Sequence, residues 1–140
     1  MRLESPLANL FGFERAPRTP AERTAVQQGL ARLRDGDAMF VMSPAAGCRL
    51  QSVKLDFGAL TPAFETVDGK SAPPPAAATD GHADLDADYT FHCKAPEALR
   101  QIDVALFDPF PGIQRVGVQL VTPKSQAGAT LTRANRRLSW

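Results

Sequence analysis

Alternation of apolar and polar side chains is clearest over residues 83–93. One face of this segment carries Ala83, Leu85, Ala87, Tyr89, Phe91 and Cys93, and the other carries His82, Asp84, Asp86, Asp88, Thr90 and His92. A period of two predicts a β-strand with one face on a core. Residues 48–57 alternate in the same way, but the phase slips by one residue between Leu50 and Val53. This slip predicts a second strand with a β-bulge near Gln51 and Ser52.

One segment has the spacing of a helix instead. Val26, Leu30 and Leu33 recur at helical intervals, and Thr19 followed by Pro20 and Glu22 is typical of a capped helix start. The pattern predicts a helix from Pro20 to Arg34, ended by residues 35–37. The apolar residues 38–42 that follow fit either a continued helix or a strand.

Further strands are predicted over residues 102–106, 115–121 and 129–132, with a helical turn at 95–99 and a stiff turn at 108–112. The connections are mostly short and rich in Gly and Pro, which favours antiparallel pairing. We therefore predict an α+β fold: an antiparallel β-sheet, either single or folded into a sandwich, with one main helix.

The remaining segments read as loops or as a strand end. Residues 9–19 and 58–80 are predicted to be loops, and the Pro- and Ala-rich part at 66–80 is predicted to be flexible. Residues 1–4 resemble the end of a strand whose pairing partner lies upstream of them.

Composition narrows the function classes. The length of 140 residues fits a single domain over residues 1–140. A net charge of +1 gives no electrostatic reason to expect nucleic-acid binding. No apolar run approaches the roughly 20 residues needed to span a bilayer, so we expect no membrane insertion. The sequence shows no nucleophile or acid–base constellation, which argues against an enzyme.

The polar face of residues 82–92 is the main candidate for metal binding. His82, Asp84 and Asp86 would lie about 6.6–7 Å apart along a strand, and imidazole with carboxylates suits zinc. His92 shares this face but would lie about 33 Å from His82, so it could form only a separate, second contact. An alternating acidic strand is also typical of a plain solvated surface, and that alternative stays open.

Several runs resemble a known family. They are residues 3–17 (LESPLANLFGFERAP), 81–83 (GHA), 89–93 (YTFHC), 110–113 (FPGI), 119–123 (QLVTP) and 137–140 (RLSW). Together they resemble the ZrgA-like family of periplasmic proteins linked to zinc acquisition. The resemblance implies an exported protein, located in the periplasm, that assists zinc uptake. Relatives usually carry a signal peptide and a His-containing first strand, so we expect the natural N-terminal segment to be missing here.

The resemblance also assigns roles to particular residues. Cys48 and Cys93 match family cysteines, which implies a Cys48–Cys93 disulfide in an exported protein. The alternative is a pair of buried free thiols. Relatives place a dense His, Asp and Glu tract before the 83–93 strand, whereas residues 68–79 here (DGKSAPPPAAAT) offer only Asp68. We therefore expect zinc to be bound weakly, with His82, Asp84, Asp86 and His92 as its candidate ligands.

Two functions remain open from the sequence. The first is a periplasmic accessory zinc-binding protein whose partner is the periplasmic component of a zinc importer. The second is an envelope interaction module without bound metal, which would dock a transporter or another partner through the 7–17 loop or an exposed sheet edge. Phe11 and Phe13 in that loop fit either an exposed recognition patch or core packing, and we favour core packing.

Overall fold

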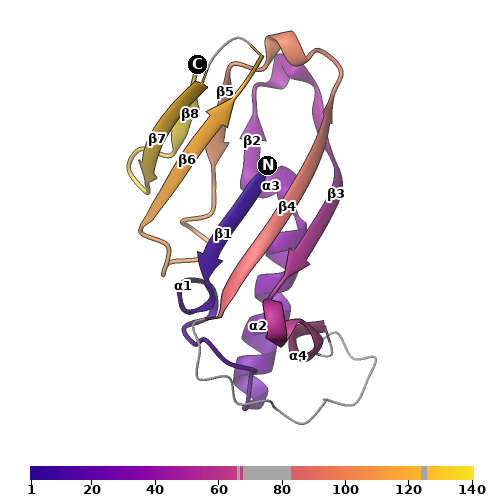
Figure 1. Cartoon of the computed structure of the whole chain (residues 1–140), viewed down its shortest axis with the longest axis vertical. Helices are drawn as coiled ribbons and strands as arrows, with labels where there is room; N and C mark the ends of the chain where they lie inside the picture. Colours follow the sequence, from indigo (N-terminus) through magenta and orange to yellow (C-terminus); the bar gives the residue numbers. More distant parts are fainter. Residues whose placement is uncertain (66, 68–82, 124–125) are drawn as a thin grey trace.

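The computed structural model describes residues 1–65, 67, 83–123 and 126–140. Within these residues the strands form three antiparallel sheets, ordered β1-β4-β3 (sheet A), β2-β5-β8 (sheet B) and β6-β7 (sheet C) (Figure 1). The strands are β1 (Arg2–Pro6), β2 (Phe40–Met42), β3 (Cys48–Asp56), β4 (Asp84–Cys93), β5 (Gln101–Val104), β6 (Arg115–Val121), β7 (Gln126–Thr132) and β8 (Arg137–Ser139).

Helices fill the connections between these strands. They are α1 (Leu7–Phe11), α2 (Pro20–Arg34), α3 (Gly36–Met39) and α4 (Thr61–Glu65), with 3₁₀ turns η1 (Pro44–Ala46), η2 (Gly58–Leu60) and η4 (Pro96–Ala98). The predicted α+β class with one main helix is confirmed, since α2 has 15 residues and each of the other helices has five or fewer. Among the described residues, no helix combines the length and apolarity needed to cross a membrane.

Strand β4 is the central strand of sheet A. Buried and exposed side chains alternate along it as predicted. Leu85, Ala87 and Tyr89 are fully or almost fully buried, while Asp84 and Asp88 face solvent. The predicted bulge is also confirmed, because the pairing of β3 with β4 shifts by one residue between Leu50 and Ser52. The strand at the start of the chain, β1, pairs with β4 and forms one edge of sheet A. Its register could not be read from residues 1–4 alone, because the partner lies some 80 residues away.

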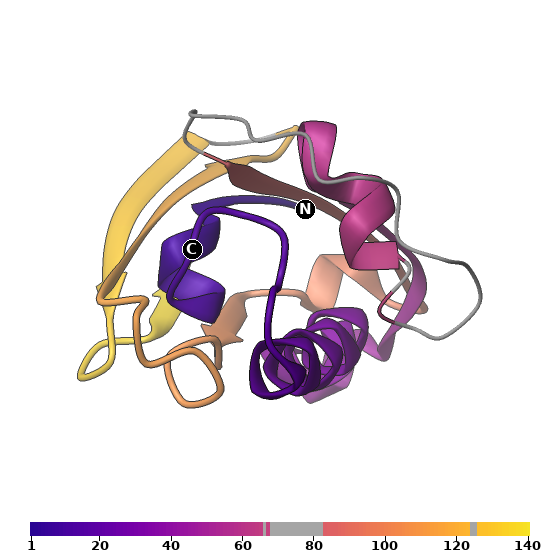
Figure 2. The ribbon, with the colours of Figure 1, turned by 90° about the horizontal axis from the view of Figure 1, so that it is seen from below.

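The core lies between the inner face of sheet A and helix α2, which face each other in Figure 2. Val26, Leu30 and Leu33 form the buried stripe of α2, as their spacing predicted. The Tyr89 hydroxyl donates a hydrogen bond to the Leu33 carbonyl at 2.8 Å, which joins the two layers. Burial raises the pKa of Tyr89, so this hydroxyl stays protonated and remains a donor.

The structure corrects several local predictions. Residues 38–42 are both helix and strand, because α3 ends at Met39 and β2 begins at Phe40. The predicted loop at 9–19 begins inside α1, and the predicted loop from residue 58 begins with η2 and α4. Within the proposed flexible stretch 66–80 only Val67 is described, and it is buried; the rest lies outside the described residues.

An ion pair and several hydrogen bonds to Glu22 stabilise the start of α2. Both oxygens of the Glu22 carboxylate accept from the Arg15 guanidinium, at 2.7 and 3.0 Å, and Oε2 also accepts from the Arg18 and Thr19 N–H groups. The hydrogen bond from Arg15, followed by that from the Arg18 N–H, lowers the pKa of Glu22 to about 2. Glu22 with the Thr19 side chain forms the predicted capping box.

We expect Glu22→Gln to lower the melting temperature at pH 7 and to have little effect near pH 2. The folded pKa lies below the ordinary value of 4.5, so this stabilisation is full above about pH 4.5 and is lost as pH falls towards about 2. Thermal unfolding at both pH values measures the difference. The control Glu97→Gln removes an exposed carboxylate that makes no ion pair in the described part of the chain. An E22Q variant as stable as wild type at pH 7 would contradict the account.

Candidate functional site

The outer face of sheet A carries the predicted carboxylates. Asp84 opens β4 and is exposed, and the Asp86 side chain, two residues further on, is 46% exposed. Both point away from the core, because their neighbours Leu85 and Ala87 are buried. His82, the proposed imidazole ligand, lies outside the described residues.

Strand pairing adds two carboxylates that sequence reasoning missed. Glu4 of β1 lies opposite Asp86 on one side, and Asp56 of β3 lies opposite Asp86 on the other. Directly opposed residues share a face of the sheet, with Cβ atoms about 4.5–5.5 Å apart. Glu4, Asp86 and Asp56 therefore form a row across sheet A, which we call the carboxylate row. Only knowledge of the strand register could have revealed it.

Positive charges lie in the adjacent row, where Asp88 sits between Arg2 and Lys54. The Arg2 guanidinium reaches into the carboxylate row, with Nε 3.0 Å from Glu4 Oε1 and Nη2 3.0 Å from Asp86 Oδ1. The hydrogen bond to Asp86 is the main cause of a raised pKa for Arg2. Exposed ion pairs of this kind contribute little to stability, so a bound cation could displace Arg2 at small cost.

Asp56 has a structural task as well. Its Oδ1 accepts hydrogen bonds from the Gly58 N–H at 2.8 Å and from the Thr61 hydroxyl at 3.1 Å. These bonds fix the turn that leads from β3 into η2 and α4. One oxygen of Asp56 is thus engaged in the turn, which restricts how this carboxylate could approach a cation.

His92 lies at the opposite end of β4. It is exposed, and its cross-strand neighbour is Arg49, whose positive charge disfavours a metal cation nearby. Six residues of extended strand separate it from Asp86, a distance of about 20 Å. The structure therefore does not bring His92 together with Asp84 and Asp86. Across the residues that can be described, no three His, Cys, Asp or Glu side chains are grouped closely enough to hold a metal ion.

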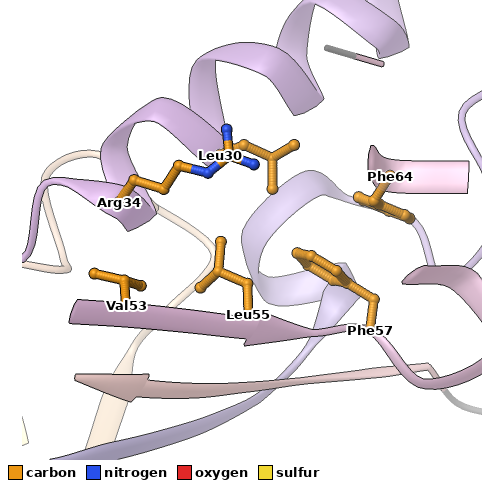
Figure 3. Close-up of a pocket in the computed structure, with 6 residues that line it drawn as sticks. All are labelled: Leu30, Arg34, Val53, Leu55, Phe57 and Phe64. Atoms are coloured by element: carbon orange, nitrogen blue, oxygen red, sulfur yellow. The ribbon is translucent and has the colours of Figure 1, made fainter. Parts of the chain in front are cut away.

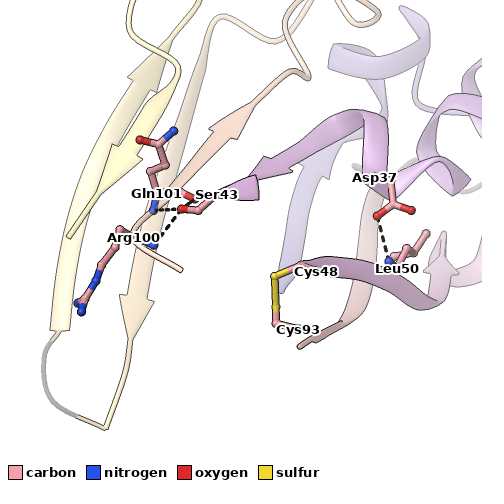
Figure 4. The surroundings of a disulfide bond; sticks show 7 residues. All are labelled: Asp37, Ser43, Cys48, Leu50, Cys93, Arg100 and Gln101. Atoms are coloured by element: carbon pink, nitrogen blue, oxygen red, sulfur yellow. Dashed lines mark hydrogen bonds between the residues drawn. A yellow bond between two sulfur atoms is a disulfide. The ribbon is translucent and has the colours of Figure 1, made fainter. Parts of the chain in front are cut away.

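The two cysteines form the predicted disulfide. Cys48 and Cys93 are directly opposed on β3 and β4, and their sulfur atoms are 2.01 Å apart (Figure 4). The bond closes the end of sheet A beside η1 and η4. Because both sulfurs are covalently paired, the thiols are not available as zinc ligands in this state.

A groove of about 220 Å³ opens between α2 and the free edge of β3 (Figure 3). Apolar side chains of Leu30, Val53, Leu55, Phe57 and Phe64 line it together with Arg34. Among the described residues, neither a carboxylate nor an imidazole lines it. These lining residues offer no zinc ligand, and they are separate from the carboxylate row.

Comparison with known proteins gives one family. No curated protein matches the chain. The sequence model described as "ZrgA family zinc uptake protein" matches residues 1–140. The match covers the helix α2, the strands of all three sheets and both cysteines of the disulfide. The chain therefore belongs to the ZrgA family of zinc uptake proteins.

Proposed function

We propose that this chain is a non-enzymatic periplasmic accessory protein that binds zinc weakly at the start of β4 and passes it to an importer's periplasmic component. Family membership supports a role in zinc uptake in general. The location is argued from the register that sets Glu4 and Asp56 on either side of Asp86. These three carboxylates alone do not form a group that could hold a metal ion, so the proposal requires His82 as a further ligand. Asp84 lies two residues before Asp86, and His82 four residues before it in sequence.

The chemistry of these residues suits transient binding. Zinc accepts imidazole nitrogen and carboxylate oxygen, but a site with one imidazole leaves most of the coordination shell to carboxylates and water. The described carboxylates are at or near the surface, and Arg2 competes for two of them. Weak affinity and fast exchange follow, and both are properties of a protein that delivers an ion rather than stores it.

The disulfide supports the proposed compartment. Structural disulfides persist in oxidising environments such as the bacterial periplasm and are rare in the cytosol. The Cys48–Cys93 bond links residues that are 45 positions apart, at the end of the central strand pair. Its position in the sheet is typical of a structural cross-link.

Docking without metal is the second candidate function, and the structure changes where such docking would occur. Leu7 is completely buried, and Leu10, Phe11 and Phe13 pack against the core. The core-packing interpretation of Phe11 and Phe13 is thus confirmed. The apolar side chains of the 7–17 segment are largely used inside the molecule, so a docking role falls to a free sheet edge.

Calorimetric titration with zinc tests the proposed site. We expect His82→Ala to weaken binding by at least about tenfold, because it removes the one imidazole near the carboxylates, and His92→Ala to change it by less than about twofold. Wild-type affinity should fall below about pH 6.5, where protons compete for the imidazole nitrogen.

Two outcomes would contradict the proposal. If wild type binds no zinc at protein concentrations well above micromolar, the zinc role fails and docking becomes the leading function. If zinc binds tightly and His82→Ala has no effect, the ligands lie elsewhere in the chain.

A further inference from the structure

We infer that the slot between β2 and the start of β3 binds an extended segment of a partner protein, which adds to β2 as a strand. The slot has a volume of about 320 Å³. Its lining includes Phe40 and Met42 from β2, Cys48 and Arg49 from β3, and Phe91 from β4. It lies beside the disulfide at the end of sheet A (Figure 4).

One wall of the slot is an unpaired strand edge. Among the strands that the structure describes, β2 pairs with β5 alone. The residues just before and just after β2 hydrogen-bond to the strand segment that contains β5. The Met39 carbonyl accepts from the Ala105 N–H at 2.8 Å, and the Ser43 N–H donates to the Gln101 carbonyl at 3.2 Å. Antiparallel strands alternate in this respect, so Met42 directs its N–H and C=O away from β5. Its N–H has no acceptor among the residues that the structure describes.

The opposite wall of the slot is the start of β3, and it also has backbone groups that point away from the neighbouring strand. The Gly47 carbonyl accepts from Lys94 N–H at 3.4 Å, so the next residue, Cys48, directs its backbone groups away from β4. The Leu50 N–H also points away from β4, and there the Asp37 side chain accepts it at 3.0 Å (Figure 4). A side chain thus satisfies one group of this edge. The Cys48 N–H has no acceptor in the described part of the chain and is left for a ligand or water.

The chemistry of the slot fits a polypeptide better than a small molecule. Backbone donors and acceptors on the walls match the backbone of an added strand, and the apolar side chains of Phe40, Met42 and Phe91 offer a seat for one apolar anchor. At the rim, Val41 is 48% exposed, and Arg49 favours an acidic residue beside the anchor.

Two other edge strands, β1 of sheet A and β8 of sheet B, carry features that oppose strand addition. In β1 the residues that face outward along the edge are Arg2, Glu4 and Pro6, and in β8 Arg137 lies on the edge. Charged residues and proline protect natural sheet edges from pairing. Strand β2, with the sequence Phe40-Val41-Met42, has neither. Of the edge strands β1, β2 and β8, β2 is therefore the one without such protection, and it faces the start of the edge strand β3 across the slot.

A selection from a displayed library of random heptapeptides tests the inference. Peptides that bind the full chain are resynthesised and titrated against four variants. Met42→Pro removes the free N–H of β2, and Val41→Lys places a charge at the rim. Ser139→Pro on the free edge of β8 and Val121→Lys, at a valine that is 72% exposed on β6, are the matched controls.

We expect selected peptides to alternate apolar and polar residues. Binding should weaken at least about tenfold in each β2 variant and change less than about twofold in each control. Circular dichroism shows whether the variants are folded, and Val41→Lys, which alters only an exposed side chain, decides the question if Met42→Pro unfolds. Failure to select any peptide, or equal binding to folded β2 variants and wild type, would overturn the inference. Neither result bears on zinc.

Discussion

Replacing both Cys48 and Cys93 by serine is expected to lower the free energy of unfolding by about 4 kcal/mol. The bond joins residues 45 positions apart, and closing a loop of this length removes that much conformational entropy from the unfolded chain. The total stability of a domain is roughly 5–15 kcal/mol, so the loss is a large fraction of it. Urea denaturation of wild type and the double variant measures the difference.

Wild type in excess reductant is the control for the serine substitutions themselves. It should have the same denaturation midpoint as the double variant, since both lack only the covalent link. A loss below about 1 kcal/mol would contradict this prediction. It would mean that β3 and β4 remain close together in the unfolded chain even without the disulfide.

Phe64→Ala should be the most damaging single core substitution that we propose, at about 3–5 kcal/mol. Phe64 is fully buried, stacks on Phe57 with ring centroids 4.6 Å apart, and contacts Phe11 at 5.4 Å. Truncation removes both ring contacts and enlarges the groove between α2 and β3, which Phe64 lines. Chemical denaturation measures the loss.

Phe13→Ala is the comparison for this variant, since Phe13 is only partly buried and touches Phe11 at the looser centroid distance of 6.3 Å. It should cost clearly less than Phe64→Ala. Equal losses of unfolding free energy in the two variants would contradict this prediction. They would mean that Phe64 does not anchor helix α4 to the core in solution.

Features with a local signal were predictable from the sequence. The capping residues Thr19 and Glu22 lie three positions apart, and the apolar stripe of α2 repeats within one helix. The alternation in β4 and the phase slip at the bulge are equally local, because period two is a property of one strand. These elements were found with bounds close to those of the structure.

Features that depend on distant contacts were not predictable. Helix α1 is only five residues long and follows a proline, and the short strand β8 is defined by its pairing with β5. The carboxylate row was missed for the same reason, since Glu4, Asp56 and Asp86 come from three separate strands. The predicted ligand His82 lies outside the described residues, so its place at the site stays a prediction.

Nuclear magnetic resonance with cobalt(II) as a paramagnetic substitute for zinc tests the central claim most directly. Cobalt accepts the same nitrogen and oxygen ligands and broadens or shifts the signals of nearby amides. If zinc binds at the start of β4, the largest effects will occur at Glu4, Asp56 and residues 84–86, with almost none at Arg49 and His92, about 20 Å away. Effects centred on His92, or spread evenly over the chain, would contradict this location.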